Sequence, residues 1–595
     1  MKKFIALLFF TASIFPQLSA QTLELKWSSK MTYDNSKDGF FNDFVGSSED
    51  YVYGLYKNLA YRPKKQNKKI KLLSFDRKTM KKVDEIVLNS PKDKSRSSKL
   101  KGMLFNQVIV LKDELIVFWT KSTKDQVEVY AESFDLELGK KVKLKKVVAF
   151  KNPSTKQSSF GAFSVVIKNS QSDETNVLIG CETGQNKNES IAFEYITIDS
   201  EFKETNKGKF DMDVIKISRS YGLTSEYQFT PDGKLYIKTN VSMSKEERKQ
   251  AKKGEHTSYS ILNIVDVETS ETDLYTIKYD GMNVFNFNLV NEGDDIRLYG
   301  FFNDMEKDPS GNRTHGIFFT TIKGGEMTEP NYSYFDKSTL DELFKNDVED
   351  KKTTRVSKKD KRKGKGAEAK KMDEEALDDH YQIELAKILD KDHIVLFCSK
   401  MYNYSVTTCT TNSSGGTSCT TRYYCSKGNV TAFNLNTKGD IVWASNIDRS
   451  ITYSGTSIKD LRVVSDPNNF YVIYGSTMKA DANSKSGKKS KKNAEIRDKF
   501  EYASFDKKSG NSSKKEVTVN SASVEKKDRK SVNPLSIQVY DNQYFINSSR
   551  ITFKPLLTAA GCTASLVCFP MLYYVGLSGD FRKGTGYLGT IKITK

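Results

Sequence analysis

The side chains that most often carry chemistry are sparse in this sequence. Its four histidines, His256, His315, His380 and His393, lie far apart, and no two have the spacing of metal ligands. Gly584–Gly589 matches the spacing GxGxxG, but no helix follows that could bind a phosphate, so we interpret the segment as a tight β-turn. The motifs GxxxxGK[ST], HExxH and GxSxG are absent. We therefore assign no catalytic residue, no cofactor and no metal ligand.

The cysteines are better suited to disulfides than to metal binding or thiol catalysis, because no CxxC motif occurs and no histidine lies near them in sequence. Cys409 and Cys419 flank a turn-rich segment. If the chain folds back about Ser414, Cys409 faces Cys419, Thr407 faces Thr421 and Ser405 faces Tyr423, which predicts a cross-strand disulfide. Cys562 and Cys568 form a second candidate pair, Cys398 and Cys425 a weaker third, and Cys181 is left over.

The first twenty residues have the pattern of a signal peptide. Lys2 and Lys3 precede an apolar run from Phe4 to Phe15, and small residues end at Ala20. We expect cleavage after Ala20, so that the mature chain begins at Gln21 in an oxidising compartment. The alternative is that the segment remains as a membrane anchor, which Pro16 and the cleavage-like ending disfavour.

One pattern recurs along the rest of the chain. A polar turn leads into a strongly apolar strand, and these strands begin at residues 51, 115, 176, 234, 296, 393, 470 and 543. The first four spacings are 64, 61, 58 and 62 residues. A second strand follows and often ends in a Ser-Phe-Asp turn, as at Ser74–Asp76, Ser133–Asp135 and Ser504–Asp506. We expect its Phe in the core and its Asp accepting backbone N–H groups.

Repeats of about sixty residues with four antiparallel strands each are typical of a β-propeller. We therefore predict an all-β fold: one seven- or eight-bladed propeller over residues 21–595, with long Lys-rich loop insertions. The N-terminal strand around Leu23–Trp27 is a candidate for completing the last blade. Two tandem β-sandwiches are the alternative, but a sandwich has no reason to repeat at a nearly fixed spacing.

The segment Phe229-Thr230-Pro231-Asp232-Gly233-Lys234-Leu235 resembles the Phe-Ser-Pro-Asp-Gly-Lys hairpin of TolB-type and WD40-like periplasmic propellers. The resemblance covers one hairpin in one repeat. It implies a binding scaffold of the cell envelope, and it supplies no catalytic residues.

The formal charge of +19 is concentrated in loops. Segments 62–71, 351–371 and 479–499 have net charges of +6, +9 and +5, and we place all three between the second and third strands of their repeats. We read 345–380 as a disordered charged insertion within the sixth repeat. The basic segments could form a positive fringe that binds an anionic partner, with the following candidate residues: Lys358, Lys359, Lys361, Arg362, Lys363, Lys488 and Lys489. Alternatively, they only keep the loops solvated.

Two nearly uncharged segments are further candidate contact surfaces. Residues 555–579 carry no charge, and the candidates there are Leu566, Val567 and Phe569. A membrane span is disfavoured by Pro570 and by the strand 572–575, which we expect to complete the last blade. In the Cys409–Cys419 hairpin the candidates are Tyr423 and Tyr424, since Tyr suits partly wet interfaces.

These observations predict a non-enzymatic, exported binding or assembly subunit. Its partners would be an envelope protein complex or an anionic envelope surface, and we expect no nucleic acid and no transmembrane span. The compartment would be the periplasm, the outer-membrane surface or the exterior. The alternative is a glycan hydrolase or lyase with carboxylates in the central channel of the propeller.

Overall fold

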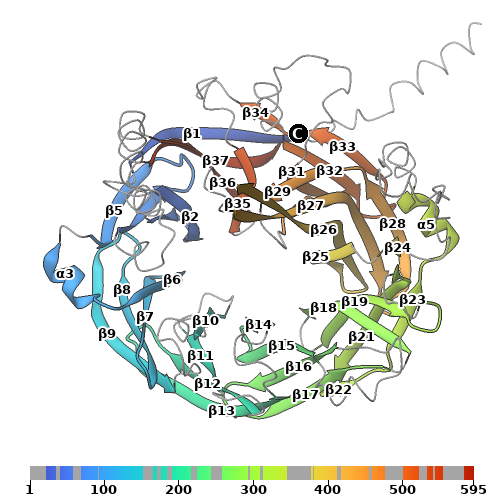
Figure 1. Cartoon of the computed structure of the whole chain (residues 1–595), viewed down its shortest axis with the longest axis horizontal. Coiled ribbons are helices and arrows are strands. Elements are labelled where there is room, and N and C mark those ends of the chain that lie inside the picture. The colour runs from blue at the N-terminus through green and yellow to red at the C-terminus, as the bar shows by residue number, and fades with distance from the viewer. Residues whose placement is uncertain are drawn as a thin grey trace, which may run out of the picture.

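A computed structural model of the chain describes residues 22–34, 40–57, 69–90, 93–151, 165–170, 176–183, 190–215, 224–242, 258–279, 281–292, 295–308, 313–344, 377–378, 381–411, 417–454, 459–475, 500–520, 532–540, 543–553 and 582–594. The strands form sheets that are arranged in a ring around one central axis, with one strand of each sheet nearest that axis (Figure 1).

The first four sheets each consist of four consecutive antiparallel strands, from the inner strand outward. Blade 1 is β2 (Phe40–Ser47), β3 (Tyr51–Lys57), β4 (Ile70–Asp76) and β5 (Lys82–Asn89); blade 2 is β6 (Leu104–Val110), β7 (Leu115–Ser122), β8 (Gln126–Phe134) and β9 (Lys140–Lys151); blade 3 is β10 (Val165–Asn169), β11 (Val177–Thr183), β12 (Ser190–Ile198) and β13 (Glu204–Ile215); blade 4 is β14 (Thr224–Phe229), β15 (Lys234–Ser242), β16 (Ser258–Asp266) and β17 (Thr272–Ile277).

Blades 5, 6 and 7 follow the same order with additions. Blade 5 is β18 (Met282–Glu292), β19 (Asp295–Asp304), β21 (Gly316–Lys323) and an outer strand in two pieces, β22 (Glu326–Met327) and β23 (Asn331–Tyr334); blade 6 is β25 (Tyr381–Asp390), β26 (His393–Thr411), β27 (Thr417–Asn436) and β28 (Ile441–Ile447), with β29 (Ile451–Ser454) also on β27; blade 7 is β30 (Arg462–Ser465), β31 (Asn469–Gly475), β32 (Phe500–Asp506) and β33 (Ser512–Glu516). A two-stranded pair, β20 (Arg313–Thr314) and β24 (Leu377–Asp378), and two short helices, α3 (Lys94–Lys99) and α5 (Lys337–Phe344), lie between or beside blades.

Blade 8 is built from both ends of the chain. It consists of β35 (Val532–Tyr540), β36 (Gln543–Phe553), β37 (Arg582–Thr594) and, as its outer strand, β1 (Thr22–Asp34). β1 pairs with β37 from Thr22 opposite Thr594 to Asp34 opposite Lys583, and β34 (Thr518–Asn520) adds a short parallel strand to its outer edge. The chain is therefore an eight-bladed β-propeller whose ring is closed by its N-terminal strand.

The sequence repeat identifies the second strand of every blade. Each predicted start lies within one residue of an observed one, from Tyr51 in β3 to Gln543 in β36. The Ser-Phe-Asp turns are also confirmed: Phe75, Phe134 and Phe505 are buried, and the carboxylate of Asp76 accepts the Thr79 N–H at 2.6 Å. The tandem-sandwich alternative is wrong, because the sheets are arranged in one ring around a common axis and not as face-to-face pairs (Figure 1).

One prediction near the C-terminus is wrong. Gly584–Gly589 is part of strand β37, not a tight turn. Gly589 is required there because a Cβ atom would lie 2.8 Å from the Lys26 carbonyl oxygen of the closing strand. The predicted strand 572–575 lies outside the described residues. The described strands β35, β36, β37 and β1 form four strands of blade 8.

The hydrophobic core is divided among the junctions between blades. Eight clusters of buried side chains each join two adjacent blades, and the cluster between blades 8 and 1 includes Phe41, Phe44, Phe545 and Leu588. Because each blade buries both of its faces against neighbours, no blade has a complete core without the ring.

A side-chain hydrogen bond also crosses each junction. In order around the ring these bonds are Tyr53–Leu136 O, Gln107–Ile167 O, Tyr227–Glu182, Lys238–Phe287 O, Asn286–Tyr381 O, Glu384 with the backbone N–H groups of Asp460 and Leu461, Arg462–Ile537 O and Gln538–Asp43. These bonds fix the position of each blade relative to the next. Among the described residues, no helix combines the length and apolar character required to cross a bilayer.

Replacing Leu25 by Ala tests the closing strand. Leu25 is fully buried in the cluster between blades 7 and 8, so we expect its truncation to lower the free energy of unfolding by about 2–5 kcal/mol. The neighbouring exposed residue provides the control: Lys26→Ala should change it by less than about 0.5 kcal/mol. Urea unfolding monitored by tryptophan fluorescence measures both, and an equal, small effect of the two changes would contradict ring closure by β1.

Candidate functional site

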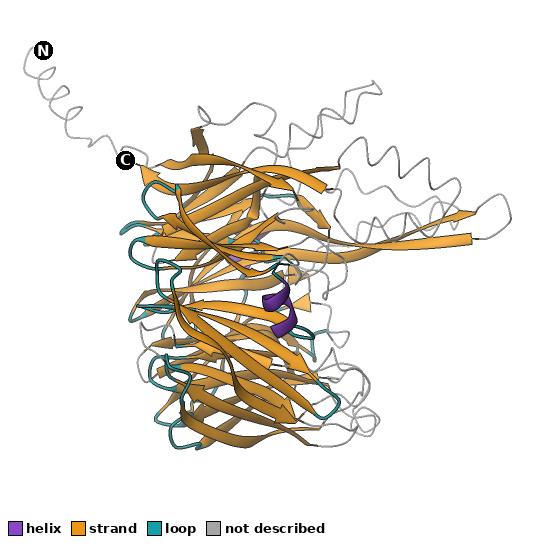
Figure 2. Cartoon of the chain, turned by 90° about the vertical axis from the view of Figure 1, so that its left-hand side faces the viewer, coloured by secondary structure: helices purple, strands orange, loops and turns teal. Residues whose placement is uncertain are grey.

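The long connections of this propeller emerge on one face. Strands alternate in direction, so the connections between second and third strands and those between successive blades leave from the same side of the disc. Short turns occupy the opposite side (Figure 2). In sequence, residues 62–69 fall between β3 and β4, with Ile70 and Lys71 already in β4, and 479–499 falls between β31 and β32, as predicted. We call this side the long-loop face.

The placement of 351–371 within the sixth repeat is wrong. This segment lies between α5 and β25, in the connection from blade 5 to blade 6, rather than between a second and a third strand. The described helix α5 before it follows the last strand of blade 5, and the described strand β25 after it is the inner strand of blade 6. Within the predicted 345–380 insertion, Leu377 of β24 is buried in the cluster of blades 5 and 6.

The most prominent element on the long-loop face is a hairpin formed by the extensions of β26 and β27. Beyond blade 6 these strands pair continuously from Met401 opposite Lys427 to Thr411 opposite Thr417, and they project clear of the disc (Figure 2). We call Met401–Thr411 and Thr417–Lys427 the projecting hairpin. At about 3.4 Å per residue its eleven-residue strands extend roughly 35 Å. Its exposed part contains a single charged residue, Arg422.

The predicted register and disulfide of this hairpin are confirmed. Cys409 faces Cys419, Thr407 faces Thr421 and Ser405 faces Tyr423. The two cysteines are disulfide-bonded with their Cα atoms 4.0 Å apart, and the Thr407 and Thr421 hydroxyl oxygens lie 2.9 Å from each other. An isolated two-stranded hairpin is marginally stable in water, so a covalent link near the tip stabilises the projecting conformation.

The hairpin has two different faces. On one face, the Tyr402 and Tyr404 rings stack with centroids 5.9 Å apart, and the Tyr404 and Tyr424 rings stack at 5.3 Å. We call Tyr402, Tyr404, Val406 and Tyr424 the tyrosine face. The opposite face carries the disulfide and Tyr423. The two predicted contact residues, Tyr423 and Tyr424, therefore point in opposite directions.

Sequence reasoning missed Tyr402, Tyr404 and Val406, although their alternation with polar residues from position 402 to 406 is the signal of one strand face. These side chains are 51%, 36% and 44% exposed. Partly exposed Tyr side chains of this kind suit a partly hydrated contact with another protein.

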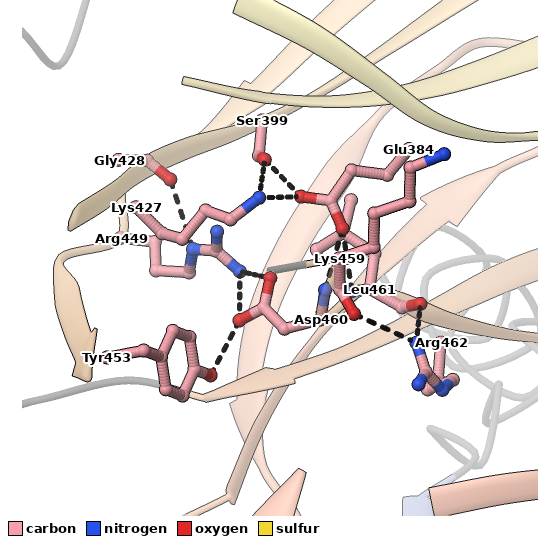
Figure 3. A network of polar contacts seen from close by, with 10 residues as sticks. All are labelled: Glu384, Ser399, Lys427, Gly428, Arg449, Tyr453, Lys459, Asp460, Leu461 and Arg462. Atoms are coloured by element: carbon pink, nitrogen blue, oxygen red, sulfur yellow. Dashed lines mark hydrogen bonds and ion pairs between the residues drawn. The ribbon is translucent and has the colours of Figure 1, made fainter. Parts of the chain in front are cut away.

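A buried ionic network lies at the root of the hairpin (Figure 3). The Lys427 ammonium group is 2.6 Å from a Glu384 carboxylate oxygen, and both side chains are sealed from solvent. The same carboxylate accepts hydrogen bonds from the Ser399 hydroxyl group and from the backbone N–H groups of Asp460 and Leu461 at 2.8 and 3.0 Å. Glu384 thereby links the inner strand of blade 6 to the hairpin root and to blade 7.

A second buried ion pair continues the network. The Arg449 guanidinium group contacts both Asp460 carboxylate oxygens at 3.1 and 3.2 Å and donates to the Gly428 carbonyl oxygen at 3.0 Å. Tyr453, on β29, donates to Asp460 at 2.7 Å. Burial, together with the Asp460 carboxylate, raises the pKa of Tyr453. These contacts hold β29 against the lower part of β27.

This network is suited to positioning, not to catalysis. Burial opposes ionisation of Glu384, but the charges of Lys427 and Arg449 outweigh it and hold the pKa of Glu384 below its ordinary value. The carboxylate is thus ionised, paired and inaccessible to a substrate. A buried network with several charge-assisted hydrogen bonds fixes one geometry, here the direction in which the hairpin leaves the disc.

Carboxylates on other inner strands are engaged separately. Burial raises the pKa of Asp43 on β2 to about 6, although its bond from Gln538 opposes the shift. Glu226 on β14 forms an ion pair with Lys238 at 2.9 Å. These acids belong to different blades and have different partners. The described residues also contain no group of three or more His, Cys, Asp or Glu side chains able to hold a metal ion.

The other predicted contact residues lie outside the described residues: Lys358, Lys359, Lys361, Arg362, Lys363, Lys488, Lys489, Leu566, Val567 and Phe569, together with the Cys562–Cys568 pair. The Cys398–Cys425 disulfide is wrong. Cys398 faces Thr431 and Cys425 faces Asn403 in the ladder, so the two thiols, each buried, are at different levels of the sheet. Burial raises the pKa of Cys181 well above its ordinary value, which makes this thiol unreactive.

No protein-family model and no curated protein matches the chain. Three solved structures illustrate its similarity to known folds. The WD40 domain of SCAP from fission yeast shares 8% identity over 82% of this chain and 89% of that one, with a TM-score of 0.31. The β-propeller domain of the Trilobed protease from Pyrococcus furiosus shares 11% over 62% and 91%, with a TM-score of 0.26. A polysaccharide lyase, an ulvan lyase, shares 7% over 82% and 96%, with a TM-score of 0.34. At these scores the similarity is to β-propeller architecture alone.

Replacing Lys427 by Met tests the root network. The change leaves the Glu384 carboxylate buried without its ammonium partner, which should lower the free energy of unfolding by about 3–5 kcal/mol. The double variant Lys427→Met, Glu384→Gln removes both charges and should recover part of the loss. Because the folded-state pKa of Glu384 is lowered, its stabilisation is present above the unfolded-state pKa and is lost as the pH falls through the folded-state value. Urea titrations between pH 7 and 3 would contradict this if Glu384→Gln showed the same acid dependence as the wild type.

Proposed function

We propose that this chain is a non-catalytic binding or assembly subunit, in which the propeller is the platform and the projecting hairpin is the element that contacts another protein. The observation that carries the proposal is the tyrosine face: an exposed row of aromatic and aliphatic side chains on a hairpin that is fixed at both ends, by the disulfide near its tip and by the Glu384 network at its root. Exposed apolar surface that folding does not require is typical of a docking site.

The physical character of the hairpin also supports protein binding. Tyr side chains bring large contact area at a low cost in conformational entropy, and their hydroxyl groups tolerate a partly hydrated interface. Because the hairpin is already rigid, little ordering is required when a partner binds. The near absence of charge favours an uncharged surface on the partner over nucleic acid.

The location we propose is the cell envelope. The support is the signal-peptide pattern of residues 1–20, the disulfide, and the resemblance of Phe229–Leu235 to TolB-type periplasmic propellers. The basic segments 62–71, 351–371 and 479–499 are connections between strands or between blades, and we propose that they add electrostatic attraction to an anionic surface near the partner.

Two tyrosines of similar exposure on opposite faces allow a matched test. Tyr402 and Tyr423 are 51% and 58% exposed, and Tyr402 alone belongs to the tyrosine face. Tagged full-length protein is isolated from gently solubilised envelopes, and the co-purifying protein is quantified by mass spectrometry. Tyr402→Ser should reduce the captured partner at least tenfold, whereas Tyr423→Ser should leave it within about twofold, since hot-spot residues dominate binding. Equal recovery with both variants, or no specific partner with the wild type, would contradict the proposal.

A further inference from the structure

Among the described residues, no strand lies along the outer edge of β26 from Tyr404 to Thr411. β25 pairs with β26 only up to Lys400, and no described strand pairs with Tyr404–Thr411 on the side away from β27. This edge is separate from the tyrosine face: it consists of backbone N–H and C=O groups along the side of the ribbon. An uncovered edge of this kind is a template for pairing with another chain.

The register shows which backbone groups point outward. The 4.0 Å Cα separation of Cys409 and Cys419 and the close Thr407–Thr421 hydroxyl contact are typical of pairs that share no backbone hydrogen bond. In such pairs the N–H and C=O groups of each residue point away from the partner strand. The outward donors and acceptors of this edge therefore belong to Ser405, Thr407 and Cys409.

The edge lacks the residues with which proteins block strand addition. Tyr404–Thr411 contains no charge and no Pro, five of its eight residues are β-branched, and its pairing with β27 has no bulge. The outer strand of blade 2 is different, because β9 carries six lysines, at positions 140, 141, 143, 145, 146 and 151. The protein thus protects an edge of the disc with charge and leaves the hairpin edge open.

The same hairpin already accepts an added strand. β29 pairs antiparallel with Tyr424–Lys427 of β27 and widens the hairpin root from two strands to three. This contact shows that a short segment from outside the two-stranded ribbon can join its ladder. On the β26 side, the corresponding position beyond Tyr404 is open.

We propose that the partner binds by adding an extended, uncharged segment as a β-strand to the Tyr404–Thr411 edge of β26, with side chains of that segment packing beside Tyr404 and Val406. Main-chain hydrogen bonds to Ser405, Thr407 and Cys409 would supply much of the affinity, and the tyrosine face would supply selectivity. This inference rests on the proposed function and specifies how the partner is recognised. An uncharged segment is favoured because Tyr404–Thr411 carries no charge, and the charged residue of the exposed hairpin, Arg422, lies across from Val406 on β27 rather than on this edge.

The Thr407–Thr421 pair permits a matched test of the edge. Thr407→Pro and Thr421→Pro each remove one outward N–H group and the same hydroxyl contact, but from opposite edges of the hairpin. In the capture assay with tagged full-length protein, Thr407→Pro should lower partner recovery at least tenfold, while Thr421→Pro and Thr407→Ala, which keeps the N–H group, should stay within about threefold of the wild type. Tenfold corresponds to about 1.4 kcal/mol.

The remaining outcomes separate this inference from the proposed function. If both proline variants bind normally while Tyr402→Ser does not, the hairpin is the contact element but strand addition is wrong. Equal losses with Thr407→Pro and Thr421→Pro also overturn the edge assignment, because the effect is then a general disturbance of the hairpin.

Sedimentation of the purified wild type tests a second copy as the occupant, and a dimer abolished by Thr407→Pro would replace the proposed partner with this chain itself. Amide hydrogen exchange should show protection of 403–409, and not of 417–423, in the captured complex.

Discussion

Ring closure is the constraint on which the rest of this structure depends. Each blade buries its two faces against its neighbours, so the eight hydrophobic clusters exist only when every junction is made. The last junction requires strand β1, which runs beside β37 and brings the two ends of the described chain into blade 8. Hydrogen bonds across the junctions, such as Gln538 to Asp43 between blades 8 and 1, then fix the blades relative to one another. A closed disc of this kind is rigid enough to hold a projecting element in a constant direction.

The disc holds the projecting hairpin, which is the candidate contact element, in a fixed orientation. Its strands are continuous with two strands of blade 6, so its direction is set by the sheet, and the Glu384 network fixes the point at which it leaves the disc. Buried ion pairs are costly to form, and their usual benefit is a specific geometry rather than stability. Here the geometry they specify is that of an exposed, nearly uncharged ribbon. The ribbon offers groups suited to binding another protein: aromatic side chains on one face and backbone N–H and C=O groups along one edge.

Much of the architecture could be predicted from the sequence because the repeat depends on local pattern. A short apolar run such as Leu115–Trp119 that follows a polar turn predicts a buried strand, and an Asp such as Asp76 marks the turn that ends the next strand, so the predicted strand starts lie within one residue of the observed ones. The register of the Cys409–Cys419 hairpin follows from symmetry about Ser414.

Other features depend on contacts between distant residues. Gly584–Gly589 was misread because its conformation is set by the approach of β1 from the other end of the chain. The network of Glu384, Ser399, Lys427 and Asp460 joins three strands and a connection that are distant in sequence, so no local sequence pattern predicts it. Of the two predicted contact residues, Tyr424 belongs to the tyrosine face and Tyr423 does not, because adjacent residues of a strand point to opposite faces and only alternate ones share a face.

The central claim is that platform and contact element are separable: the disc folds without the hairpin, and the hairpin alone engages the partner. Replacing Ser405–Tyr423 with a two-residue Asn-Gly turn between Tyr404 and Tyr424, together with Tyr402→Ser and Tyr404→Ser, tests this directly. Such a turn suits an antiparallel strand pair, and the change leaves the root network and the pairing of β29 in place. The account predicts an unfolding free energy within about 1 kcal/mol of the wild type and complete loss of the co-purifying partner. Undiminished partner recovery by the shortened protein would contradict the account.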